Sequence, residues 1–152
     1  MKKILSLICA MLFTNSLVLA QQDFSLNGFQ YRVIDKGSVA VWNCYNNQDT
    51  VIIPDFVMYN GETYTVVAID GGAFWGKDYI VSVIIPNTVT SIGQSAFQEC
   101  ENLSSVVMPN SITNIGSWAF TYCPNLTSFT IPNSVTSIGS GAFSYCSSLT
   151  SI

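Results

Sequence analysis

The chain contains no histidine, and charged residues make up only 9% of its 152 amino acids. The absence of histidine excludes histidine-based acid–base catalysis, Ser–His and Cys–His nucleophile pairs, and most zinc, copper and non-haem iron sites. Basic residues are also scarce. The five Lys or Arg and nine Asp or Glu give a net charge of −4, which argues against nucleic acid as a partner. We therefore expect neither an enzyme nor a bound cofactor.

The first twenty residues have the pattern of a secretory signal peptide. Two lysines precede an apolar stretch from Ile4 to Leu19, and Val18 and Ala20 occupy the small-residue positions before a cleavage site. A transmembrane anchor is the alternative, but the stretch is short for a membrane span and Asn15 interrupts it. Residues 1–20 are therefore predicted to be removed, which leaves no membrane span and indicates a secreted or cell-surface protein.

A 23-residue repeat dominates the rest of the chain. Pro86, Pro109 and Pro132 recur at this spacing, and each is followed at constant distances by Ile-Gly, Ala-Phe, Cys and Leu. A degenerate unit precedes them and keeps Ile69, Ala-Phe and Val83 in register. One such unit buries too few side chains to offset the ordering of its backbone, so the units must stack as a solenoid.

The residue pattern inside one unit indicates its local structure. Leu126 to Ile131 alternates between apolar and polar residues and is predicted to be a strand, and Val135 to Ile138 is a second short extended segment. Ser140 to Tyr145 is predicted to be a helical turn that directs Ala142 and Phe143 inward. We therefore expect 23-residue leucine-rich-repeat units with a parallel β-sheet on one face and short helical turns on the other.

The segment 21–64 is predicted to be a β-rich N-terminal cap. Phe29 to Ile34, Val39 to Trp42 and Val51 to Ile53 have the composition of strands. Asn60-Gly61 marks a type I′ hairpin, which accounts for the nine extra residues that follow Pro54. Because a solenoid needs an atypical end to cover its first unit, we expect an antiparallel cap here and repeats over 65–152, with the last unit incomplete.

The unit Ile131–Ile152 resembles the BspA-like class of leucine-rich repeat, and the resemblance extends over roughly 66–152. The stretch Tyr59–Tyr64 is similar to the leader that often precedes such units. The resemblance implies export to a bacterial surface or occurrence in mucosal protists, with adhesion to host matrix proteins or to neighbouring cells for some members. It implies no catalytic residues.

The chain stops at Ile152 in the middle of a predicted strand. We expect either a fragment of a longer protein or a short chain that self-associates through its uncapped C-terminal edge, because an open strand edge invites pairing.

Cys100, Cys123 and Cys146 occupy the same position in successive units. Neighbouring strands are ~4.8 Å apart, so a disulfide between two of them is geometrically possible. The cysteines follow the apolar column of the repeat, however, which favours buried free thiols. Metal binding would need His partners or closely spaced Cys pairs, and the sequence has neither.

Two sets of outward positions are candidate binding sites. The first is the concave strand face, where solenoids commonly bind ligands, although a merely solvated sheet is the alternative. Its residues are Ser82, Ile84, Ser105, Val107, Ser128 and Thr130. The second is an aromatic patch of Trp118, Tyr122 and Tyr145, which would serve as interface anchors or would pack on the neighbouring coil. Trp75 belongs to the same face one unit earlier.

These observations predict an exported leucine-rich-repeat module for binding or adhesion. Only Glu99 and Glu101 are charged from Pro86 onward, so contacts to an extracellular protein or glycan would depend little on charge. The alternatives are a structural spacer and the N-terminal part of a longer surface protein whose activity lies downstream.

Overall fold

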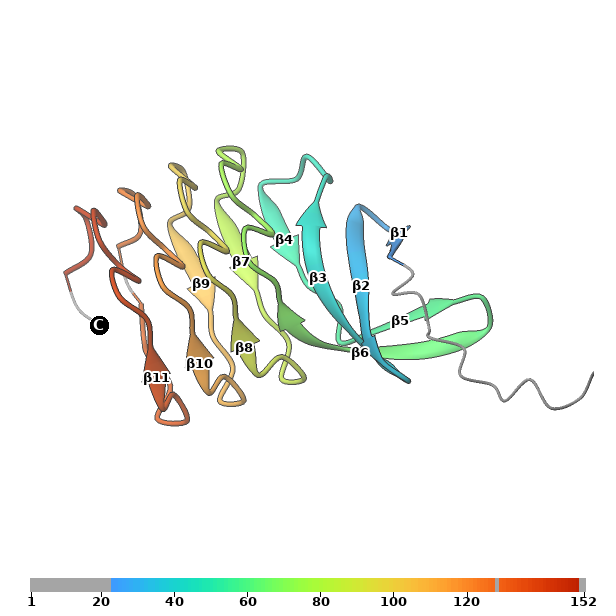
Figure 1. The fold of residues 1–152 in the computed structure, drawn as a ribbon. Coiled ribbons are helices and arrows are strands. Elements are labelled where there is room, and N and C mark those ends of the chain that lie inside the picture. The colour runs from blue at the N-terminus through green and yellow to red at the C-terminus, as the bar shows by residue number, and fades with distance from the viewer. Residues whose placement is uncertain (1–22, 128, 151–152) are drawn as a thin grey trace, which may run out of the picture.

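The computed structural model describes residues 23–127 and 129–150. A stack of coils occupies one end of the molecule, and mainly antiparallel strands continue it at the N-terminal end (Figure 1). The predicted signal peptide (1–20), Ser128 and the predicted C-terminal edge at 151–152 lie outside the described residues. Within the described ranges, no helix has the length and hydrophobicity of a membrane span.

The N-terminal strands form a sheet that continues into the coils. They are β1 (Phe24–Leu26), β2 (Phe29–Asp35), β3 (Ser38–Cys44), β5 (Phe56–Tyr59) and β6 (Glu62–Ile69). β1 pairs antiparallel with β2, and β2 pairs antiparallel with β3, whereas β3 pairs parallel with β6. β3 therefore covers the edge that β6 would otherwise leave open, which is the role expected of a cap.

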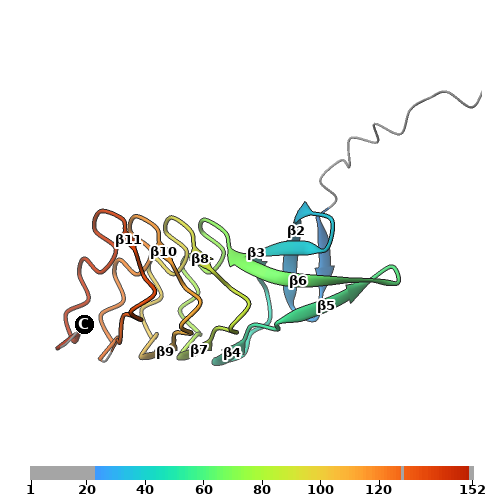
Figure 2. The ribbon, with the colours of Figure 1, turned by 90° about the horizontal axis from the view of Figure 1, so that it is seen from below.

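The predicted hairpin is confirmed. β5 and β6 pair antiparallel around Asn60-Gly61, and both turn residues have positive φ, 51° at Asn60 and 80° at Gly61. A type I′ turn requires this conformation at both central positions, and Asn-Gly adopts it most readily. The hairpin projects away from the coils in both views (Figures 1 and 2).

Two parallel sheets run along different sides of the coils (Figure 2). One contains β4 (Thr50–Ile52), β7 (Ser82–Ile84) and β9 (Ser105–Val107), and the other adds β8 (Ser91–Ile92), β10 (Asn114–Ile115) and β11 (Ser137–Ile138) to β6. Ile69, Ile92, Ile115 and Ile138 pair in register across β6, β8, β10 and β11, at 23-residue steps.

β4 differs from its predicted placement in the cap. It pairs parallel with β7, Thr50 beside Ser82 and Ile52 beside Ile84, and so belongs to the sheet of the repeats. The hairpin that follows Pro54 is an insertion within the first coil, which explains why the repeat spacing fails there. The other predicted strand, Leu126–Ile131, contains Ser128, and its described residues are not in a strand.

The predicted helical turns are wrong, because the described residues contain no helix. We call the segment of each coil that corresponds to Ser140–Tyr145 its turn segment. At two positions of each turn segment, φ lies between 54° and 68°, far from the value of about −63° in an α-helix. These positions are Gly72, Gly76, Ser95, Glu99, Trp118, Tyr122, Gly141 and Tyr145.

The backbone of each turn segment is bonded to the next coil instead. The amide N–H groups of Phe74, Phe97 and Phe120 donate to the carbonyls of Ala96, Ala119 and Ala142 at 2.7–2.8 Å. The N–H groups between them close local turns, as from Gln98 to Ser95 at 3.2 Å. This alternation satisfies the backbone without a helix and fixes the side-chain columns of successive coils.

The core is a continuous apolar column through the coils. The rings of Phe74, Phe97, Phe120 and Phe143 stack nearly parallel, with centroids 4.8, 5.1 and 5.4 Å apart.

A column of glycines allows the backbones of successive coils to approach closely. At Gly93, Gly116 and Gly139 an added Cβ would lie within 2.6 Å of the preceding coil's backbone.

Candidate functional site

The first candidate surface is the outer face of the sheet β4–β7–β9, which we call the sheet face. Parallel pairing aligns Thr50, Ser82 and Ser105 in one outward row. It aligns a second row of Ile52, Ile84 and Val107 beside the first, and their side chains are 63%, 38% and 52% exposed. The inward Val51, Val83 and Val106 between the rows are buried. The sheet face thus presents a polar row and an apolar row with no charge.

Four of the six residues predicted for this face lie together in these rows. Thr130 is exposed outside any strand, and Ser128 is not described. Ile52 also belongs to this face, but it is not among the predicted residues, because its predicted strand Val51–Ile53 was expected in the cap. The signal was present: Val-Ile-Ile-Pro occurs at 51–54 and again at 83–86.

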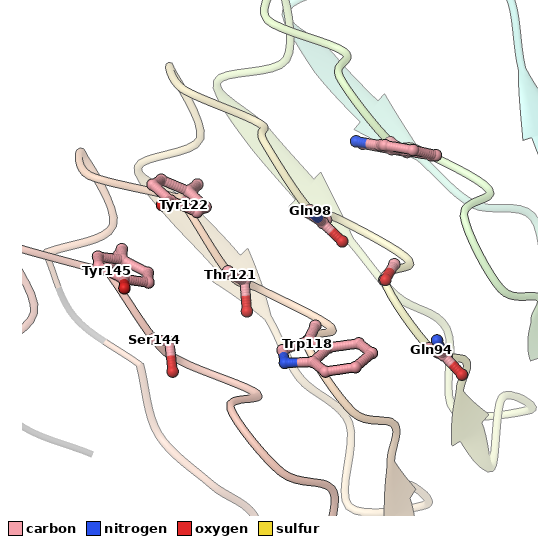
Figure 3. A pocket seen from close by; sticks show the side chains of 9 residues that line it. Gln94, Gln98, Trp118, Thr121, Tyr122, Ser144 and Tyr145 are labelled. Carbon is pink, nitrogen blue, oxygen red and sulfur yellow. The ribbon is translucent and has the colours of Figure 1, made fainter.

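The second candidate surface is a groove over the turn segments, which we call the aromatic groove. It has a volume of about 540 Å³, and four exposed aromatic side chains line it: Trp75, Trp118, Tyr122 and Tyr145. Figure 3 shows Trp118 and Tyr122 on one coil and Tyr145 on the neighbouring coil. Amides and hydroxyls complete the lining, and these are Gln94, Ser95, Gln98, Thr121 and Ser144.

The structure places the predicted aromatic patch in this groove. Tyr122 and Tyr145 stack on each other, with centroids 4.4 Å apart and planes at 8°. Trp118 lies against Gly141, where an added Cβ would be 2.7 Å from the indole. Trp118 and Tyr122 remain 47% exposed and Tyr145 remains 68% exposed, so contact with the neighbouring coil leaves much of each ring free. The sequence did not predict the polar lining residues, because the pattern of a single unit does not show which positions of neighbouring coils come together.

Arg32, Asp23 and Asp70 form the ion pairs among the described residues, and their side chains belong to neither candidate surface. Arg32 bonds to Asp70 at the start of the first coil and lies 3.9 Å from Asp23. The same guanidinium lies over the ring of Trp42, at 5.5 Å from its centroid. This cluster ties β2 to the first coil, and neither candidate surface depends on it.

The cysteine column consists of free thiols. Cys44, Cys100, Cys123 and Cys146 are all unpaired in the described part of the chain. Cys100, Cys123 and Cys146 donate to the carbonyls of Phe74, Phe97 and Phe120 in the preceding coil, at 3.0–3.2 Å. Each thiol therefore joins two coils. Among residues 23–127 and 129–150, no group of three or more His, Cys, Asp or Glu could hold a metal ion.

The thiols of this column should differ in reactivity. Burial raises the pKa of Cys100 to about 12. The neighbouring thiol of Cys146, together with burial, raises the pKa of Cys123, and the neighbouring thiol of Cys123 lowers the pKa of half-buried Cys146 to about 7. Because the thiolate is the nucleophile, we expect iodoacetamide at about pH 8 to alkylate Cys146 at least ~10 times faster than Cys100 or Cys123.

Peptide mass spectrometry of the alkylated protein measures this difference. The Cys146 rate should fall between about pH 8 and pH 6, as the thiolate becomes protonated. The unfolded chain is the control, in which all three thiols should react alike. Equal rates in the folded protein would contradict the assigned environments.

The comparisons with known proteins agree with this architecture. The family model described as BspA type leucine-rich repeat region matches residues 67–152. The chain therefore belongs to the BspA-type leucine-rich-repeat family, as its repeat pattern predicted. No curated protein sequence matches it.

Solved structures of bacterial proteins share the fold. A leucine-rich cell surface protein from Faecalibacterium prausnitzii A2-165 is 32% identical with a TM-score of 0.79, and the match covers 84% of this chain and 35% of that one. A leucine-rich-repeat protein from Bacteroides capillosus ATCC 29799 is 27% identical with a TM-score of 0.78, covering 85% and 95%. One from Bacteroides ovatus ATCC 8483 is 31% identical with a TM-score of 0.67, covering 84% and 40%. The chain thus spans about a third of the F. prausnitzii protein.

Proposed function

We propose that the chain is an exported recognition module that binds an extracellular protein or glycan by non-covalent contact. The observation that carries the proposal is the in-register row of Ile52, Ile84 and Val107, exposed on a sheet with no charge. Single exposed apolar residues are ordinary, but a contiguous apolar row beside a polar one is typical of an interaction surface. The predicted signal peptide and the similarity to a bacterial cell surface protein support export.

The structural spacer is the competing function. A spacer needs the stacked core and the glycine contacts between coils, and it gains nothing from exposed apolar side chains in a row. An enzyme has less support, because neither candidate surface contains a nucleophile–base pair. The sheet face therefore favours recognition over both.

A triple substitution of the apolar row tests the proposal. Ile52→Lys, Ile84→Lys and Val107→Lys place three charges on outward positions, so the core is unaffected. A control variant carries Ser91→Lys, Asn114→Lys and Ser137→Lys, which add the same charge along one column of the other parallel sheet. Both variants and the unmodified chain are measured on an array of extracellular-matrix proteins and neutral oligosaccharides.

The row variant should lose at least ~10-fold in affinity for one or more array ligands, because burying an unpaired lysine at an interface is costly. The control variant should bind as the unmodified chain does. If the row variant keeps every ligand, recognition through the sheet face is wrong. If the unmodified chain binds none, the spacer function is favoured and the proposal is wrong.

A further inference from the structure

We propose that the aromatic groove binds a neutral oligosaccharide, whose sugar rings stack on the exposed aromatic side chains while its hydroxyls bond to the glutamine amides. The inference rests on the proposed recognition function and names the ligand class for a surface separate from the sheet face. Three observations carry it: the placement of the aromatic residues, their backbone conformation, and the uncharged polar lining.

The groove is built on a rigid base. Backbone N–H groups of each turn segment donate to the next coil at even intervals, for example Ser95 to Ser117 at 2.9 Å and Tyr122 to Ser144 at 3.0 Å. Thr121 forms part of the floor, where it is buried and its hydroxyl donates to the carbonyl of Gly141 at 2.6 Å. Because the coils repeat at about the spacing of paired strands, ~4.8 Å, the columns above this base present a platform that suits an extended chain.

The aromatic residues stand where the backbone disfavours them. Trp118, Tyr122 and Tyr145 have φ of 57°, 59° and 59°, a left-handed conformation that strains any residue with a Cβ. Glycine occupies three of the equivalent positions, Gly72, Gly76 and Gly141, and Ser95 and Glu99 occupy the other two. The rings are about half exposed or more, so packing on the neighbouring coil accounts for only part of each ring. Strained residues that stability does not require are a feature of ligand sites.

The lining selects for an uncharged ligand rich in hydroxyls. Gln94 and Gln98 contribute amides, which both donate and accept hydrogen bonds as sugar hydroxyls do. The Nε2 of Gln98 donates to Glu99 Oε1 at 3.2 Å, which leaves its amide oxygen free to accept. None of the described residues that line the groove is charged. The flat faces of Trp and Tyr accept the C–H face of a sugar ring, as they accept other apolar surfaces.

A proline-rich peptide is the other ligand known to suit aromatic grooves. Such a peptide presents apolar rings and backbone carbonyls, and it needs an apolar floor between the aromatic residues. Here the positions between Trp75 and Trp118 are occupied by Ser95 and Gln98, which are polar. The lining therefore favours the sugar.

Tryptophan fluorescence of the full chain tests the inference. Two of the three tryptophans line the groove. The probes are hexasaccharides of glucose, mannose and N-acetylglucosamine, with a proline-rich decapeptide and heparin for comparison. The variants are Trp118→Gly and Tyr145→Gly, which remove a ring and also relieve the left-handed backbone. Tyr45→Ala removes an exposed aromatic residue outside the groove and is the matched control.

We expect at least one neutral hexasaccharide to shift the fluorescence saturably and neither heparin nor the peptide to do so. Each glycine variant should weaken that binding by about 10-fold or more while its thermal midpoint stays within about 4 °C, and Tyr45→Ala should change neither. Binding of the peptide alone, or sugar binding that survives both glycine variants, would overturn the inference. If no hexasaccharide binds while the sheet-face variant still loses array ligands, only this inference fails; if nothing binds at all, the proposed function fails with it.

Discussion

Replacing Phe97 with alanine is expected to lower the free energy of unfolding by about 3–5 kcal/mol. Phe97 is fully buried and stacks between Phe74 and Phe120, with ring centroids 4.8 and 5.1 Å away. Its backbone N–H donates to the carbonyl of Ala119 and its carbonyl accepts from the thiol of Cys123, both in the following coil, so the backbone is held in place and cannot move in to fill the space. The cost therefore includes a residual cavity as well as lost transfer free energy. Urea denaturation measures the change.

Phe143→Ala is the matched control for this substitution. It removes the same side chain from the same column, but Phe143 is only partly buried and stacks against Phe120 on one side. Its loss should cost clearly less than that of Phe97. Equal losses in the free energy of unfolding would mean that stacking on two sides stabilises the protein no more than stacking on one side, contrary to the structure.

Gly116→Ala is the second substitution with a large expected effect, a loss of about 2–3 kcal/mol or more. The added Cβ would lie 2.6 Å from the backbone nitrogen of Gln94 and 2.6 Å from the backbone carbon of Gly93. Backbone cannot rotate away as a side chain can. The N–H of Gly116 also donates to Ile92 at 2.8 Å, which holds the two coils at this distance. Relief therefore requires the coils to separate locally and to weaken this ladder.

Gly71→Ala is the control for this second substitution. The nearest atom to its added Cβ is the carbonyl oxygen of Gln94 at 3.2 Å, which needs to move only by tenths of an ångström. We expect a change within about 1 kcal/mol, as for most substitutions without a core clash. If thermal unfolding shows Gly116→Ala to be as mild as Gly71→Ala, the close contact between coils is not a determinant of stability.

The inward columns of the solenoid could be predicted from the sequence because the repeat displays them directly. Each coil needs an apolar side chain at the same inward position, as Phe97 and Phe120 show for two successive coils. The same residue therefore recurs at the same spacing, and the pattern is visible without a structure. The Asn60-Gly61 hairpin could also be predicted from the sequence, because the backbone conformation of its turn favours those residue types. The parallel strand β4 was not, because the hairpin insertion separates Ile52 from the repeat it belongs to.

The turn segments illustrate what the sequence conceals. A short apolar run with alanine and phenylalanine fits a helical turn, and only the glycines at Gly72, Gly76 and Gly141 indicated a left-handed backbone. Trp118 and Tyr122 occupy the same conformation, which residue type does not predict. The exposure of the aromatic residues followed from the pattern, but the groove between them depends on Ser95 and Gln98 of a different unit.

The central claim is that recognition uses uncharged surfaces of the coils, and its salt dependence tests the claim most directly. Binding of the purified chain to the array of matrix proteins and neutral oligosaccharides is measured at about 0.05 M and about 0.5 M salt, where screening of exposed charges differs strongly. We expect the affinities to change by less than about threefold. Binding that disappears at high salt would show that the acidic side chains make the contacts, and it would contradict the account.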